Sequence, residues 1–461
     1  MRFVDLFAGL GGFHYALRAL GHECVYASEL DPELRELYSL NFPEMGSAVY
    51  GDIREFAHKV PRHDILCAGF PCQPFSKSGS QLGLLDQTRG TLFHEILAIL
   101  KRHQPRYVLL ENVGNFERHD SGNTWRLVER GLTSLGYAVR GTTHVTSGGH
   151  GLISPHHLGF PQHRERFFIV ASLRKLPEDP FPKADRTRAT DISKIVMHRS
   201  ELTPADRLET ALTTSQVRCV KHWNAFLATV PREVELPSFP LWGDEISARY
   251  PYRDLTPFSA PLKSLRRRVP HGAFSPRPSR QQLLSLLPAY ARTEQRRFPS
   301  WKAMFIENNR EFFKSIRHHL SDEWLADLSS FPPSLRKLEW NCNGEVRDLW
   351  RCVLQFRPSG LRAKRYTSSP ALVSMTTTQI PILGPERRFL TRTEGLRLQG
   401  LPHSHRLPKT RARAFAALGN AVHAGVASAI ASRLLTGRPH AAEENFDAWR
   451  TALLDLVGGR T

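Results

Sequence analysis

The chain has 461 residues, with 63 Lys and Arg against 44 Asp and Glu and a formal net charge of +19. Its 6 cysteines are too few for a disulfide scaffold and no Cys or His spacing resembles a zinc site, so we expect no metal. No apolar run approaches the roughly 20 residues of a membrane span, so we expect no membrane segment. A chain of this length exceeds the usual size of one hydrophobic core, which predicts two domains.

The first 175 or so residues alternate short apolar runs with amphipathic stretches. Four runs have the length of buried strands: 2–6, 24–28, 64–68 and 106–110. Four stretches have helical spacing: 12–20, 32–40, 91–102 and 124–135. This alternation predicts an α/β fold with a Rossmann-like, mostly parallel sheet and helices on both faces. Because the chain opens directly with a strand, we expect no leader peptide and an intracellular location.

A glycine-rich turn, FAGLGGF (residues 7–13), follows the first predicted strand. Glycines let the backbone approach a ligand, and a helix N-terminus favours an anionic group, although a plain tight turn explains such glycines about as often. Glu29 ends the second strand, where a carboxylate can accept hydrogen bonds from both hydroxyls of a ribose. Asp52 and Ile53 follow the third strand and could hold the edge and face of an adenine. Together these features predict a nucleoside cofactor site.

The stretch GFPCQPFSKSG (69–79) places Cys72 between two prolines directly after an apolar run. Proline fixes φ, lacks a donor and keeps the preceding residue out of the helical region, so we expect Cys72 on a stiff loop at a strand end. Free cysteines are more often small buried hydrophobes than nucleophiles, which is our interpretation of Cys67, Cys219 and Cys352. A thiol on a proline-flanked loop is instead presented to a ligand.

Beyond about residue 175 the alternation fails, and prolines predict loops at 231–240 and 270–279. Residues 186–385 carry 31 Lys and Arg against 18 Asp and Glu, an excess that favours a polyanion such as nucleic acid. A solvated surface is nevertheless the commoner explanation of a single basic run such as 266–268. Six tryptophans are interpreted as the core of a second, irregular domain rather than as base-stacking platforms: Trp223, Trp242, Trp301, Trp324, Trp340 and Trp350. Regular structure returns near residue 386, with predicted helices over 391–399 and 421–435.

Six motifs, in order, resemble the DNA (cytosine-5)-methyltransferases, which are S-adenosylmethionine-dependent enzymes common in bacterial restriction-modification systems. DLFAGLGGF (5–13) resembles the cofactor loop of that family, GFPCQPFS (69–76) its nucleophile loop and ENV (111–113) its carboxylate motif. The other three are QHRER (162–166), similar to the family's QxRER, RLQGLP (397–402), similar to RLQGFP, and the closing GNAV (419–422). The match covers about residues 1–170 and 386–435.

The resemblance implies methylation of carbon 5 of a flipped cytosine within a specific double-stranded DNA sequence, through a covalent cysteine adduct. Cys72 would add to carbon 6, and Glu111 would bind ring nitrogen 3 and the exocyclic amine. Arg166 would hold the cytosine O2 and favour the thiolate. Arg164 would lie on the same strand face, with a phosphate contact or a structural pair as its alternative role. Without the surrounding motifs, Glu111 would equally be a strand-end carboxylate bound by loop amides.

The resemblance also assigns binding residues. Those expected to hold the cofactor S-adenosyl-L-methionine are Phe7, Gly9, Gly11, Gly12, Glu29, Asp52, Ile53 and Asn420. Those expected to contact the DNA substrate are Phe70, Gln73, Ser76, Gln162, Arg362 and Lys364. Arg362 and Lys364 belong to the basic run 357–365, which is about equally a DNA-facing loop or a solvated surface turn.

In domain terms, we expect residues 1–185 to form the catalytic and cofactor-binding domain and 186–385 the target-recognition domain. Residues 386–461 would complete the catalytic domain. We expect a monomer in the bacterial cytoplasm that associates with the nucleoid through double-stranded DNA. A restriction endonuclease would be its functional partner.

Two alternatives stay open at this point. One branch of the family methylates cytosine in tRNA with the same motifs, although that branch is compact and the large basic middle region argues against it. The other alternative is a catalytically silent DNA-binding regulator. Such a protein would be expected to lose Cys72, Glu111 or the cofactor glycines, and all are present.

Overall fold

The computed structural model describes residues 1–71, 92–141, 150–270, 277–372, 376–443 and 446–458. The chain forms two compact units. The first comprises residues 1–210, 367–380 and 390–461, and the second comprises 211–366 and 381–389. Both ends of the chain therefore contribute to the first unit. The functional division at residues 185 and 385 stays a prediction.

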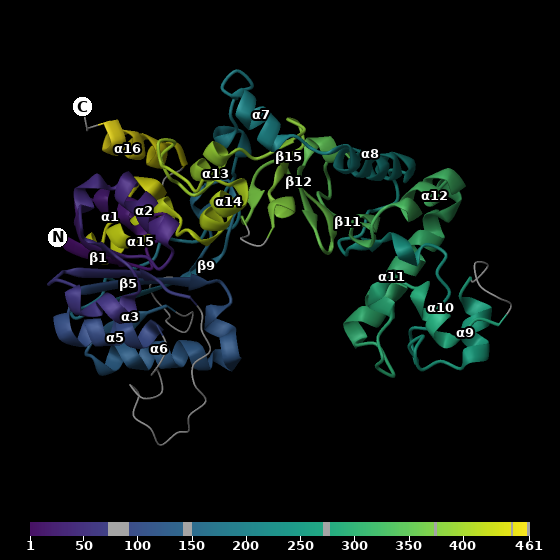
Figure 1. Cartoon of the computed structure of the whole chain (residues 1–461), viewed down its shortest axis with the longest axis horizontal. Helices are drawn as coiled ribbons and strands as arrows, with labels where there is room; N and C mark the ends of the chain where they lie inside the picture. Colours follow the sequence, from purple (N-terminus) through teal and green to yellow (C-terminus); the bar gives the residue numbers. More distant parts are fainter. Residues whose placement is uncertain (72–91, 142–149, 271–276, 373–375, 444–445, 459–461) are drawn as a thin grey trace. The chain divides into compact units, whose positions relative to one another are not determined.

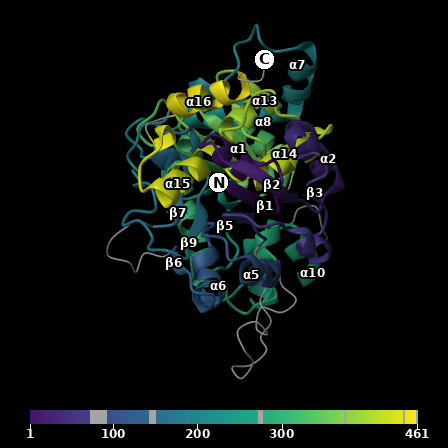
Figure 2. The same ribbon diagram turned by 90° about the vertical axis from the view of Figure 1, so that its left-hand side faces the viewer.

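An eight-stranded sheet forms the centre of the first unit, in the order β3-β2-β1-β4-β5-β9-β6 with β7 beside β9. Its strands are β1 (Arg2–Leu6), β2 (Glu23–Ser28), β3 (Val49–Tyr50), β4 (Ile65–Gly69), β5 (Tyr107–Val113), β6 (Ala138–Arg140), β7 (Leu152–Ile153) and β9 (Arg166–Ser172). The strands from β3 to β5 pair in parallel, whereas β9 runs antiparallel to its neighbours. Figure 2 shows β1, β2 and β3 side by side. β8 (Gln162–His163) and β14 (Ser369–Pro370) form a separate parallel pair.

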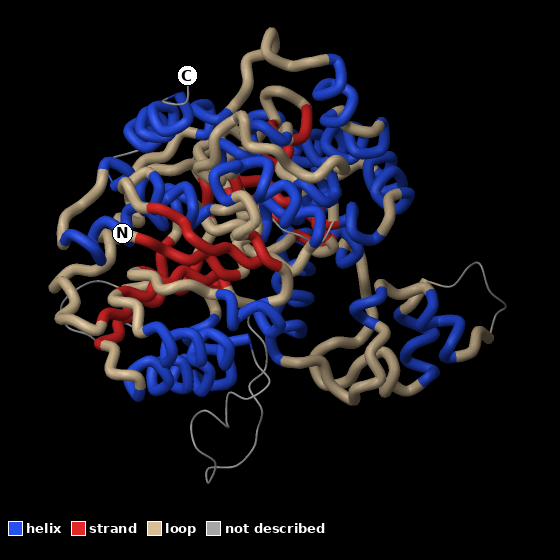
Figure 3. Tube along the Cα trace, turned by 60° about the vertical axis from the view of Figure 1, so that its left-hand side comes forward, coloured by secondary structure: helices blue, strands red, loops and turns tan. Residues whose placement is uncertain are grey.

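Helices cover both faces of this sheet, as Figures 1 and 3 show, with α1 and α15 on one face and α5 and α6 on the other. The helices of the first unit are α1 (Gly12–Arg18), α2 (Pro32–Asn41), α3 (Ile53–Phe56), α5 (Leu92–His103), α6 (Asn123–Ser134), α7 (Pro204–Thr210), α13 (Arg392–Leu398), α14 (Arg411–Asn420), α15 (Ala424–Thr436) and α16 (Phe446–Gly458). The predicted α/β class and its mostly parallel sheet are confirmed.

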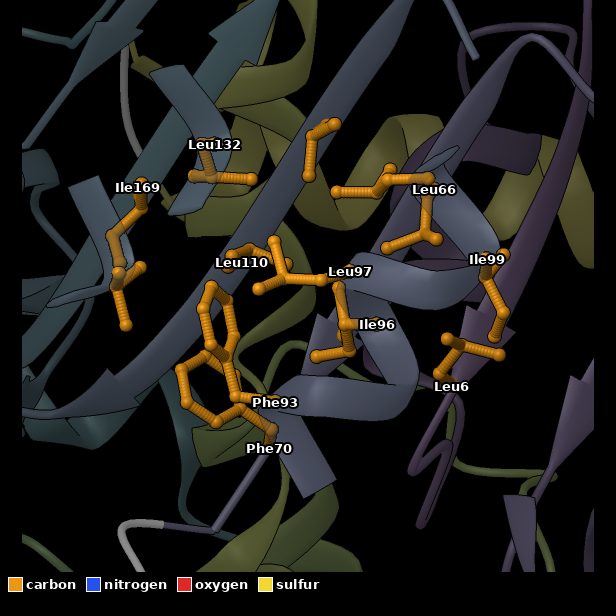
Figure 4. Packing of buried hydrophobic residues seen from close by; sticks show 14 of the residues in the cluster. Leu6, Leu66, Phe70, Phe93, Ile96, Leu97, Ile99, Leu110, Leu132 and Ile169 are labelled. Atoms are coloured by element: carbon orange, nitrogen blue, oxygen red, sulfur yellow. The ribbon is translucent and has the colours of Figure 1, made fainter. Parts of the chain in front are cut away.

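The core on the α5 face fixes the ends of the central strands. Leu66 of β4 and Leu110 of β5 pack with Leu97 of α5, each essentially inaccessible to solvent (Figure 4). Complete burial of one such side chain contributes about 1.5–3 kcal/mol. Phe70 follows β4, and its ring centre lies 5.6 Å from that of Phe93. Because the Phe70 side chain is packed in this core, the backbone position at the end of β4 is fixed.

Strand β5 is longer than the sequence predicted. Its apolar run ends at Leu110, but the ladder with β9 continues through Glu111, which pairs with Phe168, to Val113. Glu111 therefore lies inside the strand, and the expectation that it follows the strand was wrong. The extension is made by backbone pairing, which leaves no apolar pattern in the sequence.

One stretch that is long and apolar enough for a membrane span was overlooked in the sequence. The helical run Arg411–Thr436 is long and apolar enough to cross a membrane by length and composition, contrary to the expectation from sequence. In this fold 83% of its most apolar window is buried inside the protein. Its C-terminal half, α15, is rich in Ala and other small residues, which allow close packing against α1. The stretch has the burial of a core helix.

The second unit contains a six-stranded sheet in the order β10-β11-β13-β12-β15-β16. Its strands are β10 (Leu241–Trp242), β11 (Lys337–Asn341), β12 (Val353–Arg357), β13 (Gly360–Lys364), β15 (Ile382–Leu383) and β16 (Arg388–Phe389). Its helices are α8 (Thr214–Thr229), α9 (Leu262–Arg268), α10 (Arg280–Ser285), α11 (Ser300–Ile316) and α12 (Asp322–Ser330). The short strands and frequent prolines hid this sheet in the sequence.

The tryptophans of the second unit mostly pack inside it, as predicted. Trp223, Trp242 and Trp340 are buried, and Trp324 stacks on the imidazole of His222 with 4.5 Å between ring centres. Trp301 is different, because 53% of its surface is exposed. The interpretation of Trp301 as a core residue was wrong.

Asp5 of β1 provides a test of the buried sheet. Its carboxylate is buried and accepts a hydrogen bond from the Tyr38 hydroxyl at 3.2 Å. Burial raises the pKa of Asp5 well above its ordinary value. The unfolded chain ionises Asp5 near pH 4, so the wild type loses stability as the pH rises above about 4.

Asp5→Asn removes this ionisation and should give a higher free energy of unfolding at pH 7 but no gain at pH 4 or below. Urea unfolding at both pH values measures the difference. Asp64→Asn, which changes an exposed carboxylate that accepts from the Arg2 amide, is the matched control. An equal gain at both pH values would contradict this account.

Candidate functional site

A cavity of about 480 Å³ opens at the carboxyl ends of the parallel strands of the first unit. Such strand ends are where ligands bind in open α/β sheets. The cavity brings together nine of the residues predicted from sequence: Phe7, Gly9, Glu29, Asp52, Ile53, Phe70, Glu111, Arg166 and Asn420. These residues come from loops and strands separated by more than 400 positions in the chain.

The turn after β1 is tied to the end of β2 by one carboxylate. Glu29 accepts hydrogen bonds from the Gly9 amide at 2.8 Å and from the Asp31 amide at 2.9 Å. Phe7 and Gly9 have positive φ values of 57° and 52°, a strained conformation for phenylalanine that is typical of ligand-binding turns. Burial raises the pKa of Glu29, and the two amide hydrogen bonds partly oppose that shift. Each carboxylate oxygen keeps a further lone pair for a ligand hydroxyl.

The opposite wall combines a polar cap with an apolar side chain. Asp52 caps α3 by accepting from the Arg54 amide at 3.0 Å, and it also pairs with the Arg54 guanidinium. That guanidinium lowers the pKa of Asp52. Ile53 is buried beside it, while Leu30, on the loop after β2, is 66% exposed and lines the same cavity. A flat, partly polar ligand could lie between such surfaces.

A buried ion pair occupies the β5 side of the cavity. Glu111 of β5 lies 3.0 Å from Arg166 of the neighbouring antiparallel β9, measured from Oε1 to Nε. Burial raises the pKa of Glu111, while Arg166 and then Arg164 act in the opposite direction. A carboxyl group with a raised pKa takes up a proton more readily, so Glu111 can both accept and donate hydrogen bonds.

Arg164 lies behind the cavity rather than in its lining. Its side chain is buried, and Nη2 donates to the Ala421 carbonyl oxygen at 2.9 Å. Among the described residues, Nε and Nη1 have no hydrogen-bond partner. Burial lowers the pKa of Arg164 to about 9, and the adjacent Arg166 charge adds to the shift. The geometry agrees with the structural alternative for Arg164, a contact to another part of the chain.

Residues 417–422, which Arg164 holds through the Ala421 carbonyl, close the cavity. Ala417, Asn420, Ala421 and Val422 line it, and Val422 packs so closely that a Cβ on Gly12 would lie 2.2 Å from the Val422 carbonyl oxygen. Glycine at position 12 is therefore required by packing against a distant segment.

Arg413 of α14 holds the same stretch from its other side. It pairs with Asp31 at 2.5 Å and with Glu33 at 3.0 Å, both at the start of α2. Neither Gly11 nor Gly12 lines the cavity. A Cβ on Gly11 would meet the ring of Phe42, and a Cβ on Gly12 would meet Val422. Their roles in cofactor binding stay predictions.

The other predicted residues lie elsewhere. Cys72, Gln73 and Ser76 fall outside the described residues. Gln162 of β8 is fully buried, and within the described ranges neither atom of its amide has a hydrogen-bond partner.

Arg362 and Lys364 lie on β13 of the second unit, where Arg362 Nε contacts Glu339 Oε2 at 2.5 Å. Residues 357–365 are not the loop that the sequence indicated. They form most of the β12–β13 hairpin, because β12 ends at Arg357 and β13 begins at Gly360.

Some lining residues were missed from the sequence. Asn112 donates from Nδ2 to the Phe70 carbonyl at 2.9 Å and so fixes the start of the loop that carries the predicted nucleophile. Its place beside Glu111 in the ENV motif was the available signal. Ala421 and Val422 belong to the GNAV motif, which was their signal, whereas Leu30 lies in no motif. Across the described parts of the chain, no cluster of three or more His, Cys, Asp or Glu could hold a metal ion.

Comparison with known proteins supplies independent findings. The family described as C-5 cytosine-specific DNA methylase matches residues 1–234 and 291–436. The type II methyltransferase M.AluI of Cellulosimicrobium cellulans is 32% identical, over 92% of this chain and 90% of its own. M.HhaI of Haemophilus parahaemolyticus is 44% identical over 37% of this chain and 48% of its own. A crystal structure of the S. pombe Dnmt2 methyltransferase aligns with 95% of this chain and 99% of its own at a TM-score of 0.42 and 16% identity.

Gly12→Ala tests the close approach of the closing stretch. The added Cβ meets the Val422 backbone, which cannot rotate away, so we expect the free energy of unfolding to fall by about 1–3 kcal/mol. Gly69→Ala is the matched control, because its Cβ would meet the same Val422 at an ordinary contact distance of 3.4 Å. Thermal denaturation compares the two. Equal melting temperatures for both variants would show that Val422 does not pack on α1.

Proposed function

Because the chain belongs to the C-5 cytosine-specific DNA methylase family, we propose that it methylates carbon 5 of a cytosine within a specific double-stranded DNA sequence. The methyl donor is S-adenosyl-L-methionine. The observation that carries this proposal is a single cavity with Glu29 at one side and the Glu111–Arg166 pair at another. A nucleoside-type donor and a pyrimidine ring require these two kinds of surface within reach of each other.

The side of the cavity that carries Glu29 has the hydrogen-bond acceptors that an adenosine needs. Glu29 offers its remaining lone pairs to ribose hydroxyls, and Asp52 and Ile53 offer a polar edge and an apolar face to the adenine. Asn420 and the strained turn at Phe7 complete the wall. When bound, S-adenosyl-L-methionine supplies an electrophilic methyl group. The protein holds and orients the donor and keeps water away from the methyl group.

The side of the cavity that carries Glu111 suits the cytosine ring. Carbon 5 of cytosine is a poor nucleophile, so electrons must first be pushed into the ring. The thiolate of Cys72 adds to carbon 6, and the displaced ring electrons reach carbon 5. Glu111, with its raised pKa, donates a proton to ring nitrogen 3 and accepts from the exocyclic amine. Phe70 and Asn112 hold the start of the Cys72 loop beside this group.

The later steps restore the ring. Carbon 5 would take the methyl group as the bond between that group and the sulfonium sulfur of the donor breaks, which leaves a neutral thioether. A base or water then removes the carbon 5 proton, the carbon 6–sulfur bond breaks to release the thiolate, and ring nitrogen 3 returns its proton to Glu111. Arg166 is assigned to the cytosine O2, and its positive charge favours the thiolate form of Cys72. Its ion pair with Glu111 holds the guanidinium in the wall of the cavity.

Substrate recognition is assigned to residues 186–385. A cytosine inside a stacked duplex cannot reach the cavity, so the base must be flipped out of the helix. The basic middle region is suited to hold the DNA while base contacts choose the sequence. The relatives carry type II methyltransferase names, which supports a role in a restriction-modification system and a functional pairing with a restriction endonuclease. We assign the protein to the cytoplasm.

Methyl transfer from labelled S-adenosyl-L-methionine to plasmid DNA and to tRNA, side by side, tests this function. We expect label in double-stranded DNA and none in tRNA. Label in tRNA alone would mean that the chain is an RNA methyltransferase. Label in neither, with DNA binding retained, would mean a catalytically silent DNA-binding protein.

Glu29→Ala tests the donor site. The variant removes an acceptor for ligand hydroxyls and frees the turn at Gly9, and an unpaired polar group costs about 1–3 kcal/mol. Affinity for S-adenosyl-L-methionine should fall about tenfold or more by calorimetry. Glu36→Ala, which removes an exposed carboxylate from α2, should leave the affinity unchanged. Unchanged affinity in Glu29→Ala would refute the donor site.

Cys72→Ser tests the covalent step. Serine has nearly the same shape, but its hydroxyl is almost never ionised near neutral pH, so methylation should fall by orders of magnitude. A duplex with 5-fluorocytosine at the target position should trap the wild type on DNA, because fluorine cannot leave as a cation. A denaturing gel should show this adduct for the wild type and for Cys67→Ser, but not for Cys72→Ser. The same adduct from Cys72→Ser would identify another residue as the nucleophile.

A further inference from the structure

Residues 242–316 of the second unit form a helical lobe with a core of its own. The lobe contains α9, α10 and α11, which lie together in Figure 1. Its core includes Leu265 of α9, Leu283 of α10 and Ile306 of α11. Residues 235–290 lie between the two stretches that match the methylase family. Much of the lobe is therefore an addition that the matched family does not require.

The lobe is anchored to the sheet of its unit. The Trp242 amide donates to Asn309 Oδ1 of α11 at 2.6 Å, and β10 pairs with β11. Lys337 of β11 lies over the rings of Trp242 and Tyr290, at 5.3 and 4.9 Å from their centres. These contacts fix the lobe, with its charged side chains, to the sheet of the second unit.

The lobe has a large excess of positive charge, with 14 Lys and Arg against 6 Asp and Glu in residues 242–316. Some of the acidic groups are already committed. Glu245 is buried and pairs with Arg310 at 2.8 Å, and Asp244 pairs with Arg336 at 3.1 Å. These carboxylates cannot neutralise the lobe's surface.

Some of the arginines are structural. Arg266 donates from Nε to the Pro278 carbonyl at 3.0 Å, which ties the end of α9 to the segment before α10. Arg280 of α10 donates to the carbonyls of Phe258 and Ala260 at 2.6 and 2.8 Å. Both side chains have acceptors inside the lobe and are not available to a partner.

Four of the other cations lie on α9 or just before α10, and all four are free within the described residues. Lys263, Arg267, Arg268 and Arg277 are exposed, and in the described part of the chain none of them forms a hydrogen bond or ion pair through its side chain. Lys263 and Arg267 are four positions apart on α9, on the side of the helix opposite the buried Leu265. Arg277 precedes Pro278, whose carbonyl binds the neighbouring Arg266. We call these four residues the cationic face.

We infer that the cationic face binds phosphate groups of double-stranded DNA outside the recognised sequence. The inference rests on the proposed function, which supplies the DNA. Lys and Arg without companion acceptors bind phosphates of any sequence, whereas base reading needs matched donors and acceptors. The face therefore adds affinity rather than specificity. Its charge sign, its rigid support and its place in an addition to the family fold all fit this partner.

The test replaces the four cations with glutamine, which removes the charge, keeps an unbranched polar side chain and has a similar helix preference. Lys263→Gln, Arg267→Gln, Arg268→Gln and Arg277→Gln are combined in the full chain. Binding to a duplex of random sequence is measured by fluorescence anisotropy at several salt concentrations. Each lost phosphate contact should reduce the slope of log affinity against log salt by about 0.9. We expect the slope to fall by about 2–4.

A charge-matched control separates this effect from net charge. Lys101, Arg130, Arg174 and Lys175 are exposed cations of the first unit, and their combined change to glutamine should leave the slope unchanged. The far-UV circular dichroism spectrum and the melting temperature of the lobe variant should match those of the wild type, which shows that the variant is folded.

Two results would overturn the inference. One is an unchanged salt slope in the folded lobe variant. The other is an equal fall in slope in the control variant, which would mean that only net charge matters. Vesicles of anionic phospholipid are tested in parallel, and loss of vesicle binding with an intact DNA slope would assign the face to a membrane surface instead. If the wild type transfers no methyl group to DNA, the proposed function fails, but the salt slopes still decide whether this face binds DNA.

Discussion

The hydrogen bond from Arg164 to the Ala421 carbonyl joins two parts of the chain 257 positions apart, and the cavity depends on this closure. The sheet provides one side of the cavity from β1 to β5, but the wall opposite comes from the stretch that ends α14. That stretch can approach only because position 12 has no side chain, and Arg413 holds it to the start of α2. The cavity therefore exists only in a chain whose two ends have folded together.

The same region concentrates groups that are costly to bury. Glu111 and Arg164 are both buried, and each has a pKa shifted towards its neutral form. A buried charge that is only partly paired reduces stability, and Phe7 adds backbone strain at the β1 turn. Proteins accept such costs where chemistry requires them. Here the cost in stability falls on Glu111, which is assigned to bind the cytosine, and on Arg164 and Phe7, which support the walls of the cavity.

Local rules predicted a large share of this arrangement. Apolar runs and helical spacing predicted the central strands and helices, and the motifs beside these runs predicted Glu29 and Glu111 as site residues, which do line one cavity. What failed depends on distant contacts. Nothing near Arg164 in the sequence indicates its acceptor at Ala421, and nothing near Gly12 indicates Val422. The β12–β13 hairpin was mistaken for a loop because its basic run conceals paired strands, and the exposure of Trp301 depends on how α11 packs.

The central claim is that this cavity methylates carbon 5 of cytosine at one DNA sequence. Bisulfite sequencing of DNA from cells that express the chain, in a host without cytosine methylation, tests it most directly. The account predicts protected cytosines at one fixed position in nearly every copy of a single short sequence, and none with an empty vector. Full conversion of all cytosines, or protection scattered without regard to sequence, would contradict it.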